Sequence, residues 1–338
     1  MEELAALSGI SRPTLSKYFN DPGSVRQSTL ARIEEALERF EYRPNVFAMN
    51  ANRRLTRNIG VVVPYLSDPF FAEIARNMER LCADAGFHPI LFSSDGDPDR
   101  EAANLDSVQA IKPAGALIAP LGRRTHRDML EGFCESVPTV LFDCDVEGVG
   151  DAFYGSNKSQ GIGIMLDYLM SAGEAPAFFE MQDAPNPNAN KLRDAYETQM
   201  RARGQEPMIL RAQGQGWNFE EIGYLEGARM IDERRLPTNT VLCSNDRLAI
   251  GFLAASYERG LRVGKGPGHA LRVAGNDNHP FARFACPSLT TVGQDYDAIS
   301  GASFDKLLSI LESGRRPETA SERDARVFDG HLVKRNSA

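Results

Sequence analysis

The polar side of a short helix near the N-terminus is the first place where the sequence could do chemistry. Residues 11–20 read SRPTLSKYFN, and Ser11 is placed to cap a helix by accepting the backbone N–H of Thr14. At about 100° per residue, one side of this helix consists of Arg12, Pro13, Ser16 and Lys17, and the other side of Leu15, Tyr18 and Phe19. Two cations on an outer face suit recognition of a nucleic acid, but they equally suit a solvated helix. These ten residues alone leave both interpretations open.

A second candidate set consists of polar residues that directly follow apolar runs further along the chain. They are Asp68, Asp143, Asn245, Asp246 and Asp277. Carboxylates and amides at the carboxyl ends of parallel strands suit a ligand that carries hydroxyl groups. Each of these residues could instead be a turn residue or a helix cap.

Catalytic and metal-binding patterns are the third possibility, and the sequence does not favour them. The five cysteines and five histidines are dispersed without CxxC, HxxxH or HExxH spacing, so we expect buried apolar cysteines and no metal or disulfide. The stretches GSNKSQGIG (155–163) and GKGPGHA (264–270) lack the spacing of phosphate-binding loops. We therefore interpret them as glycine-rich loops and expect neither an enzyme nor a cofactor.

Composition indicates a soluble globular protein with uneven charge. The chain has 338 residues, of which 42% are hydrophobic and 25% charged. No apolar run is long enough for a membrane span, and the first twenty residues do not resemble a signal peptide, so we predict a cytoplasmic protein without a membrane partner. Residues 1–58 carry nine cations and seven acids, a net charge of +2, whereas the whole chain carries −8. A small basic module joined to a large acidic one is the expected arrangement.

The elements around the first candidate predict three short helices. MEELAAL ends at Gly9, a favoured helix stop, and QSTLARIEEALERF places Leu30, Ile33, Leu37 and Phe40 on one stripe. Helix, tight turn and helix, with a third helix behind them, is a helix-turn-helix arrangement, and we assign it to residues 1–43. Residues 44–58, which contain three arginines near their end, are expected to form a hinge or linker.

From residue 59 onward the sequence alternates between buried strands and amphipathic helices. IGVVVPYL is a continuous apolar run, as expected for a parallel strand buried on both faces, and DPFFAEIARNMERLCADAG is the helix that follows. A second strand–helix series begins near residue 160. The predicted fold class is α/β, with an all-α headpiece followed by two doubly wound parallel-sheet subdomains.

In combination these motifs resemble the LacI/GalR family of bacterial transcription factors along essentially the whole chain. The motifs are the helix-turn-helix, YRPN, IGVVVP, DPFFAEI, SND–LAIG, VAGND and LTTVGQDY, in that order. The resemblance implies a core like that of periplasmic sugar-binding proteins (type I), in which the chain crosses between subdomains near residues 158, 291 and 322. The core then covers 59–338, with an N-subdomain of about 59–158 plus 292–322 and a C-subdomain of about 159–290 plus 323–338.

The resemblance also implies which residues contact double-stranded operator DNA. Arg12, Pro13 and Lys17 match positions that read bases, and Lys17 replaces the more usual arginine with a point charge. Arg26 stands where a small polar residue often caps the third helix, and is expected to add a phosphate contact. The full implied DNA-binding set is Ser11, Arg12, Pro13, Ser16, Lys17, Asn20, Arg26, Thr29, Tyr42, Asn45, Ala48 and Ala51.

Ala51 is a departure from the family pattern, because many members carry a leucine there that wedges into the minor groove. The lost apolar burial, at roughly 0.8 kcal/mol per CH₂, is about 2–2.5 kcal/mol. Unstacking a base step costs a few kcal/mol. We therefore expect less operator bending, or a wedge formed by Met49 with Arg53 or Arg54 on the backbone. The family also has several residues, including a threonine cap, ahead of the helix that begins here at Met1. Two interpretations stay open: the true N-terminus lies upstream of Met1, or the first helix lacks its usual cap.

The resemblance implies an effector in the cleft between the subdomains. The implied effector-binding residues are Phe70, Phe71, Asp143, Arg193, Trp217, Asn245, Asp277 and Tyr296. Aromatic faces and planar polar groups suit a sugar or a similar small polar molecule. We further expect a homodimer with the helix from Phe71 to Ala85 at its interface. The main alternative is a periplasmic sugar-binding protein without a regulatory role, which shares the core but has a signal peptide and no headpiece.

Overall fold

The computed structural model describes residues 2–20, 22–40, 56–171, 173–319 and 322–338. It divides into two compact units, Met1–Thr56 and Arg57–Ala338, and each is described by itself.

The first unit is a small helical bundle. Its elements are α1 (Glu2–Ser8), α2 (Arg12–Asn20), the 3₁₀ helix η1 (Pro22–Ser24) and α3 (Gln27–Arg39). Leu4, Ile10, Leu15, Ile33 and Ala36 form its buried core. The structure confirms the three predicted helices and the apolar side of α2. The local signals also act as predicted, because Gly9 follows α1 at φ +65° and the Thr14 N–H donates to Ser11 Oγ at 3.4 Å.

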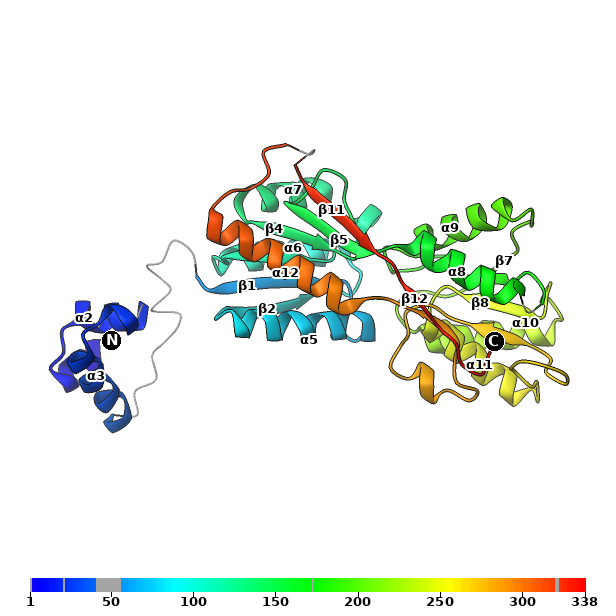
Figure 1. Cartoon of the computed structure of the whole chain (residues 1–338), viewed down its shortest axis with the longest axis horizontal. Helices are drawn as coiled ribbons and strands as arrows, with labels where there is room; N and C mark the ends of the chain where they lie inside the picture. The colour runs from blue at the N-terminus through cyan, green and yellow to red at the C-terminus, as the bar shows by residue number, and fades with distance from the viewer. Residues whose placement is uncertain (1, 21, 41–55, 172, 320–321) are drawn as a thin grey trace. The chain divides into compact units, whose positions relative to one another are not determined.

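The second unit contains two parallel sheets, as predicted. The sheet of the N-subdomain has the strand order β11-β5-β4-β3-β1-β2. Its strands are β1 (Asn58–Val63), β2 (His88–Ser93), β3 (Gly115–Ile118), β4 (Thr139–Phe142), β5 (Ala152–Ser156) and β11 (Asp324–Phe328). Helices α5 (Pro69–Asp84) and α12 (Tyr296–Ser313) pack on one face, whereas α6 (Pro98–Ala110) and α7 (Arg127–Ser136) pack on the other (Figure 1). β1 is buried on both faces, as its continuous apolar sequence requires.

The sheet of the C-subdomain has the strand order β7-β6-β8-β9. Its strands are β6 (Ala177–Met181), β7 (Ile209–Ala212), β8 (Thr240–Cys243) and β9 (Arg272–Ala274), and all pair in parallel. Helices α8 (Lys158–Ser171) and α9 (Ala189–Ala202) cover one face, and α10 (Phe219–Asp232) and α11 (Asp246–Glu258) cover the other. A two-stranded antiparallel sheet joins β10 (Thr291–Gly293) to β12 (His331–Val333). Short 3₁₀ turns lie at Gly122–Arg124 and Ala282–Phe284.

We expected the third crossing between the subdomains near residue 322, but it lies later in the chain. β11 pairs in parallel with β5, from Asp324↔Ala152 to Phe328↔Ser156, so residues 324–328 belong to the N-subdomain. The chain reaches the C-subdomain only at β12. The physical reason is that β11 is an edge strand whose residues are largely exposed, so the sequence DARVF has no apolar run to mark it.

The three crossings are tied together by hydrogen bonds. The Asn157 N–H donates to Phe328 O at 2.8 Å, which joins the first crossing to the third. The Gly330 N–H donates to Gln160 Oε1 at 2.9 Å. The second crossing joins the first through a hydrogen bond between Ser156 Oγ and Gln294 Oε1.

Helices α10 and α11 approach each other more closely than side chains would allow. A Cβ atom added to Gly251 would lie 2.0 Å from Glu220 O and 2.6 Å from Tyr224 N. A Cβ atom added to Gly223 would lie 2.3 Å from Leu248 O. Glycine at these two positions therefore permits backbone-to-backbone contact between the helices. Both helices begin at the cleft between the two subdomains. The contact therefore fixes the positions of their first turns relative to each other in the wall of the cleft.

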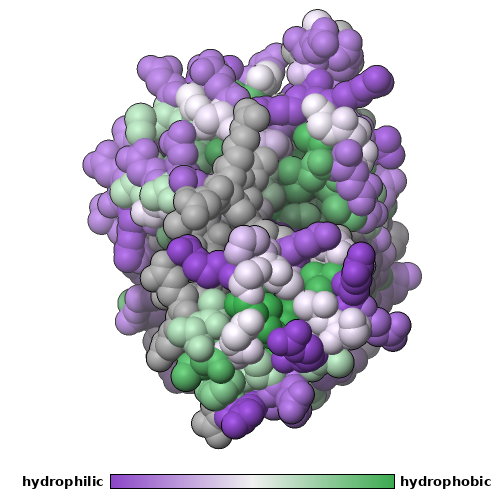
Figure 2. Space-filling model, turned by 90° about the vertical axis from the view of Figure 1, so that its left-hand side faces the viewer, coloured by the Kyte–Doolittle hydropathy of each residue, from purple (hydrophilic) through white to green (hydrophobic). Residues whose placement is uncertain are grey.

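The surface follows the composition. Figure 2 shows mainly hydrophilic residues at the surface, with smaller areas of apolar residues among them. Among the described residues, no helix is long and apolar enough to cross a membrane.

Candidate functional site

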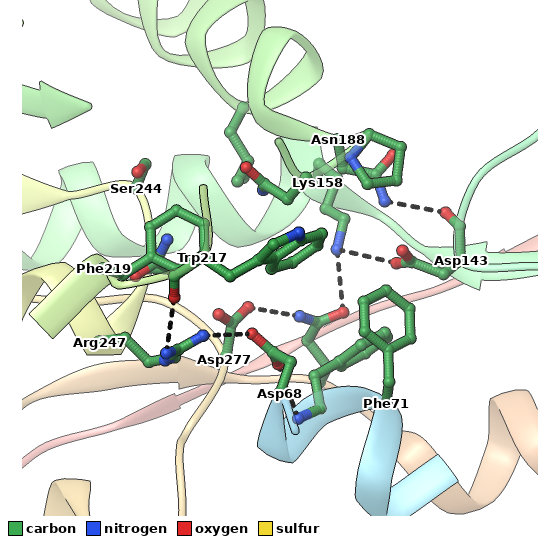
Figure 3. Close-up of a pocket in the computed structure, with 16 residues that line it drawn as sticks. Asp68, Phe71, Asp143, Lys158, Asn188, Trp217, Phe219, Ser244, Arg247 and Asp277 are labelled. Atoms are coloured by element: carbon green, nitrogen blue, oxygen red, sulfur yellow. Dashed lines mark hydrogen bonds and ion pairs between the residues drawn. The ribbon is translucent and has the colours of Figure 1, made fainter. Parts of the chain in front are cut away.

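The candidate site is a cavity between the two subdomains of about 490 Å³, including the part open to solvent. Side chains reach it from the start of α5, the end of β4, the start of α8, the segments before α9 and α10, and the turns after β8 and β9. In Figure 3, Trp217 and Lys158 face Asp68, Phe71 and Asp143 across this space. Ligands of open parallel sheets bind beyond the carboxyl ends of the strands, and the cavity occupies that place in both sheets.

Six of the eight residues implied for effector binding line this cavity. They are Phe70, Phe71, Asp143, Trp217, Asn245 and Asp277. Asp143 and Asp277 both adopt positive φ angles, 60° and 118°, at turns that follow β4 and β9. Asp and Asn residues tolerate this region better than most side chains.

Arg193 and Tyr296 are placed elsewhere. Arg193 lines a neighbouring, more open cavity of about 1210 Å³, and Trp217 forms part of the wall of both cavities. The Arg193 guanidinium lies 3.5 Å from Glu180 Oε1 and donates to Asn190 Oδ1 at 2.8 Å. Tyr296 supports the wall from behind, because its hydroxyl donates to Asp277 O and its ring lies edge-on to Phe70 with centroids 5.4 Å apart.

Two of the residues that follow strands, Asp68 and Asn245, both cap a helix and line the cavity. Asp68 caps α5 by accepting the Phe70 N–H at 3.0 Å, and Asn245 caps α11 by accepting the Leu248 N–H at 2.8 Å. Asp246 is instead a buried structural residue. It accepts the Thr291 hydroxyl at 2.6 Å and the His279 N–H at 2.7 Å.

Several lining residues were missed by the sequence analysis. The polar ones are Lys158, Asn186, Asn188, Ser244, Arg247 and Gln294. Lys158 lies within GSNKSQGIG, which we interpreted as a glycine-rich loop, whereas residues 158–171 form α8. Arg247 directly follows the SND motif, so its position next to a predicted ligand-binding turn was an available signal. Asn188 and Gln294 reach the site from connecting segments that carry no periodicity.

Two cations hold the carboxylates at the site. Arg247 bridges the subdomains, because its Nη1 donates to Asp68 Oδ2 at 3.1 Å. On the other side its Nε and Nη2 donate to the two Glu220 carboxylate oxygens at 2.7 and 2.8 Å, and Nη2 also donates to Trp217 O at 2.8 Å. Lys158 Nζ donates to Gln294 Oε1 at 2.9 Å and lies 3.8 Å from Asp143 Oδ1. Burial raises the pKa of both Asp68 and Asp143, and Arg247 and Lys158 respectively oppose that rise.

Asp277 has no such cation in direct contact among the described residues. Its Oδ1 accepts the Gln294 amide at 2.6 Å and the Asn276 amide at 2.9 Å. Burial raises the pKa of Asp277 well above its ordinary value, and the nearby Asp246 raises it further. Lys158 opposes this rise from a distance, so Asp277 is the carboxyl group of the site with the weakest support from a cation.

Trp217 connects the two subdomains at the cavity. Its ring stacks on Tyr65 with centroids 4.8 Å apart, and its Nε1–H donates to Asp95 O at 3.3 Å. Trp217 is 6% exposed, so it is held almost fully within the wall that it forms. The site as a whole offers carboxylates, amides and aromatic faces, which can bind a small polar molecule. Among the described residues, no group of three or more His, Cys, Asp and Glu side chains could hold a metal ion.

The first unit contributes a separate candidate surface on α2. Arg12, Pro13 and Lys17 are exposed, and Ser16 is half-buried. Thr29 is half-buried in the first turn of α3, and Arg26 occupies the N-cap of that helix without a side-chain capping bond. Asn20 ends α2, but its side chain lies outside the described residues, as do Tyr42, Asn45, Ala48, Met49, Ala51, Arg53 and Arg54.

Two protein families match parts of this chain. Residues 1–45 match "Bacterial regulatory proteins, lacI family", and residues 167–337, about half of the chain, match "Periplasmic binding protein-like domain".

Curated relatives and solved structures agree with these matches. The ribose operon repressor of Escherichia coli (strain K12) is 26% identical over 313 residues, which cover 91% of this chain and 92% of that protein. The HTH-type transcriptional repressor PurR of Proteus mirabilis (strain HI4320) is 27% identical and covers 100% and 96%. A lac repressor dimer bound to operator and the anti-inducer ONPF has the same fold, with a TM-score of 0.84 at 21% identity over 99% of this chain and 97% of that one.

Proposed function

The chain belongs to the lacI family of bacterial regulatory proteins, and from this premise we propose that it is a ligand-responsive transcriptional repressor. It binds operator DNA through its helix-turn-helix unit, and a small molecule bound between the core subdomains changes its affinity for DNA. The observation that carries this proposal is the presence of both parts in one chain. The exposed Arg12–Lys17 side of α2 and the polar cavity of the core each suit one of the two ligands.

The protein acts as a homodimer on double-stranded DNA. One helix-turn-helix unit makes few contacts, so specific binding needs two units on two half-sites. We propose that α5 contributes to the interface, because its apolar residues face the core and leave a charged outer side with Glu73, Arg76 and Arg80.

We assign base reading to three residues of α2. Arg12 would clamp a guanine with two parallel hydrogen bonds, Pro13 would pack on a thymine methyl, and Lys17 would provide a single donor. Phosphate contacts are assigned to Ser16, Asn20, Arg26, Thr29, Tyr42 and Asn45. The hydroxyl of Ser11 is engaged as the cap of α2.

The hinge hypothesis concerns the shape of the bound operator. Ala51 is too small to hold a kinked base step alone, so we expect a less bent operator or a wedge formed by Met49. A complex with the kink centred on an intercalated Ala51 would contradict this.

The effector is proposed to be a sugar or a similar small polar molecule. Two relatives carry names that refer to ribose and to purines, and both classes present hydroxyl or ring N–H groups. The effector works only through its difference in affinity for the two subdomain arrangements, because equal affinity for both would shift nothing. The relatives are repressors and not enzymes, so we propose binding without turnover, in the cytoplasm where operator DNA lies.

The experiment uses the full chain and operator sequences selected from random DNA. Fluorescence anisotropy measures DNA affinity with and without a panel of sugars, sugar acids and nucleobases. We expect tight binding to a selected sequence and at least a fivefold change with one class of ligand. Failure to retain any DNA would exclude a repressor, and an affinity unchanged by every ligand would exclude ligand response. Chemical conversion of a panel member would favour an enzyme.

A further inference from the structure

The charges and the unused hydrogen-bonding groups of the cavity restrict the chemistry of its ligand. Three carboxylates, Asp68, Asp143 and Asp277, line the cavity together with only two cations, Lys158 and Arg247. Glu220 adds a fourth carboxylate, because it binds the same guanidinium as Asp68. Carboxyl groups therefore outnumber cations in and next to the cavity wall before any ligand enters.

The two cations are already engaged. Arg247 makes four contacts of 2.7–3.1 Å with Asp68, Glu220 and Trp217 O, and its Cζ atom lies 5.1 Å from the centre of the Phe219 ring. Lys158 is shared between Gln294 and Asp143, and the Phe70 ring covers it at 5.9 Å. An anionic ligand would have to break one of these ion pairs, which would leave a buried carboxylate unpaired.

Two further cations, Arg193 and Lys191, lie outside the cavity. Arg193 lies in the neighbouring cavity beyond Trp217, where it faces Glu180 and binds Asn190. Lys191 is exposed, and its ammonium lies 3.9 Å from Cys144 Sγ, next to Asp143. Lys191 lowers the negative potential near Asp143 but is not among the residues that line the cavity.

Two acceptors in the cavity wall are available to a ligand. Asn188 is 5% exposed, and within the described structure its Oδ1 is a buried atom without a hydrogen-bond partner, while its amide donates to Asp143 O at 3.1 Å. Both amide donors of Asp277 bind Oδ1, so Oδ2 is available to a ligand. A buried acceptor without a donor is unfavourable, and a ligand hydroxyl or ammonium group would remove that penalty.

We propose that this cavity accepts polyhydroxylated ligands that are uncharged or cationic, such as free sugars and amino sugars, and rejects sugars that carry a phosphate or a carboxylate. This rests on the proposed function, since it concerns the effector of the same site. The ligand's hydroxyl groups donate to Asn188 Oδ1 and to the Asp277 carboxylate, and its ring packs against Trp217 and Phe71. A phosphate at the same place would meet three carboxylates and no available cation. Discrimination therefore arises from repulsion as well as from attraction.

The test compares matched pairs of probes on the full-length protein by calorimetry and thermal shift. The pairs are D-ribose with D-ribose 5-phosphate, and D-glucose or D-glucosamine with D-glucose 6-phosphate and D-gluconate. We expect at least one neutral or amino sugar to bind, and its anionic counterpart to bind at least about tenfold more weakly. An anion that binds as tightly as its neutral partner, or a panel in which no neutral or amino sugar binds, would overturn the proposal.

A variant separates charge from shape. Asp277→Asn keeps the size of the side chain and removes the uncompensated charge, so the ratio of phosphate-sugar to sugar dissociation constants should fall about tenfold. Asp106→Asn is the matched control, because Asp106 is exposed on α6 away from the cavity. If Asp277→Asn does not fold, Asp143→Asn provides the same measurement. An unchanged ratio in the folded variant would contradict the charge argument.

Operator binding is measured on the same samples, so that the two proposals can fail separately. A protein that binds operator and responds to a phosphorylated sugar remains a repressor but contradicts the proposed ligand class. A protein that binds neutral sugars but no DNA contradicts the repressor and supports the ligand class.

Discussion

Asp246 is a buried carboxylate that joins α11 to two other segments of the C-subdomain. It accepts hydrogen bonds from Thr291 and from the His279 backbone, and burial raises its pKa to about 7. Because the pKa is higher in the folded protein than in the unfolded chain, the folded state binds more protons between about pH 4 and pH 7. The contribution of Asp246 to the free energy of unfolding is therefore largest at low pH and is lost as the pH rises toward 7.

We predict that this dependence is visible in Asp246→Asn. Relative to this variant, the unmodified protein should lose up to about 1.4 kcal/mol of unfolding free energy per pH unit between pH 5 and pH 7. Urea unfolding followed at pH 5, 6, 7 and 8 measures the difference, and Asp106→Asn serves as the exposed control. Parallel stability curves for the two proteins would show that Asp246 does not titrate in this range.

Arg12 and Lys17 carry the prediction for DNA recognition. Arg12→Ala should weaken operator binding by about 1–3 kcal/mol and relax the preference at one base pair, since a two-bond contact to a guanine would be lost. Lys17→Ala should cost less, because a single ammonium donor makes a less directional contact. Anisotropy titrations at fixed salt on the selected operator and on its single-base variants measure both effects.

Arg32→Ala is the matched control for these variants. Arg32 is exposed on α3 and is not assigned to the DNA contact, so its loss removes one charge from the same unit. An equal loss of affinity in all three variants would indicate a general charge effect and not base reading.

At the residue scale, sequence reasoning identifies side chains on marked turns and misses those on unmarked segments. Asp143, Asn245 and Asp277 directly follow apolar strands, and the structure places all three at the cavity. Gln294 also lies there, but no spacing in the chain indicates that its amide meets Lys158. The contact between Gln294 and Lys158 depends on how the two subdomains pack against each other, and this packing is a property of the tertiary structure.

The contact between α10 and α11 gives a prediction at the element scale. Gly251→Ala would place a Cβ atom 2.0 Å from Glu220 O, so the helices would have to separate. We expect the core to lose about 1–3 kcal/mol of unfolding free energy, as overpacked sites commonly do. Sugar affinity should also fall, because Phe219 and Arg247 at the starts of these helices would shift.

Gly132→Ala on α7 should stabilise the protein, in contrast to Gly251→Ala. A Cβ atom there has no neighbour within 4 Å, and alanine favours a helix by about 0.5–1 kcal/mol. Urea unfolding of both variants should therefore show changes of opposite sign. A Gly251→Ala protein as stable as the unmodified one would mean that the helix contact is less close in solution.

Elements with a continuous buried run are predictable, and exposed edge elements are not. From Ile59 to Val63, β1 is a continuous buried run without a polar side chain, and its prediction is confirmed. β11 alternates charged and apolar residues at the edge of the sheet, and without its partner β5 nothing in its sequence separates it from a loop. Strand pairing between segments about 170 residues apart therefore corrected the expected position of the third crossing.

The whole molecule consists of two units with different ligands, and its single tryptophan reports on one of them. Trp217 lies in the cavity wall of the core, and the first unit contains no tryptophan. We predict that the sugar that binds best raises the midpoint of the thermal transition seen by tryptophan fluorescence. At a concentration of 100 times Kd, the added stability is about 2.7 kcal/mol.

Circular dichroism at 222 nm follows helices in both units. Because each unit is compact by itself and the sugar binds the core alone, we expect the helical loss that belongs to residues 2–40 to occur at the same temperature with and without sugar. A common shift of all signals would show instead that the two units unfold together.

Gln294 lies both in the cavity wall and at the second crossing between the subdomains. Its amide contacts Asp277 and Lys158 in the cavity wall, and its backbone lies between β10 and α12 in the segment where the chain changes subdomain. We expect a ligand that competes for this amide to act on the segment that joins the two subdomains. Binding in the cavity and a change in the angle between the subdomains would then be coupled through Gln294.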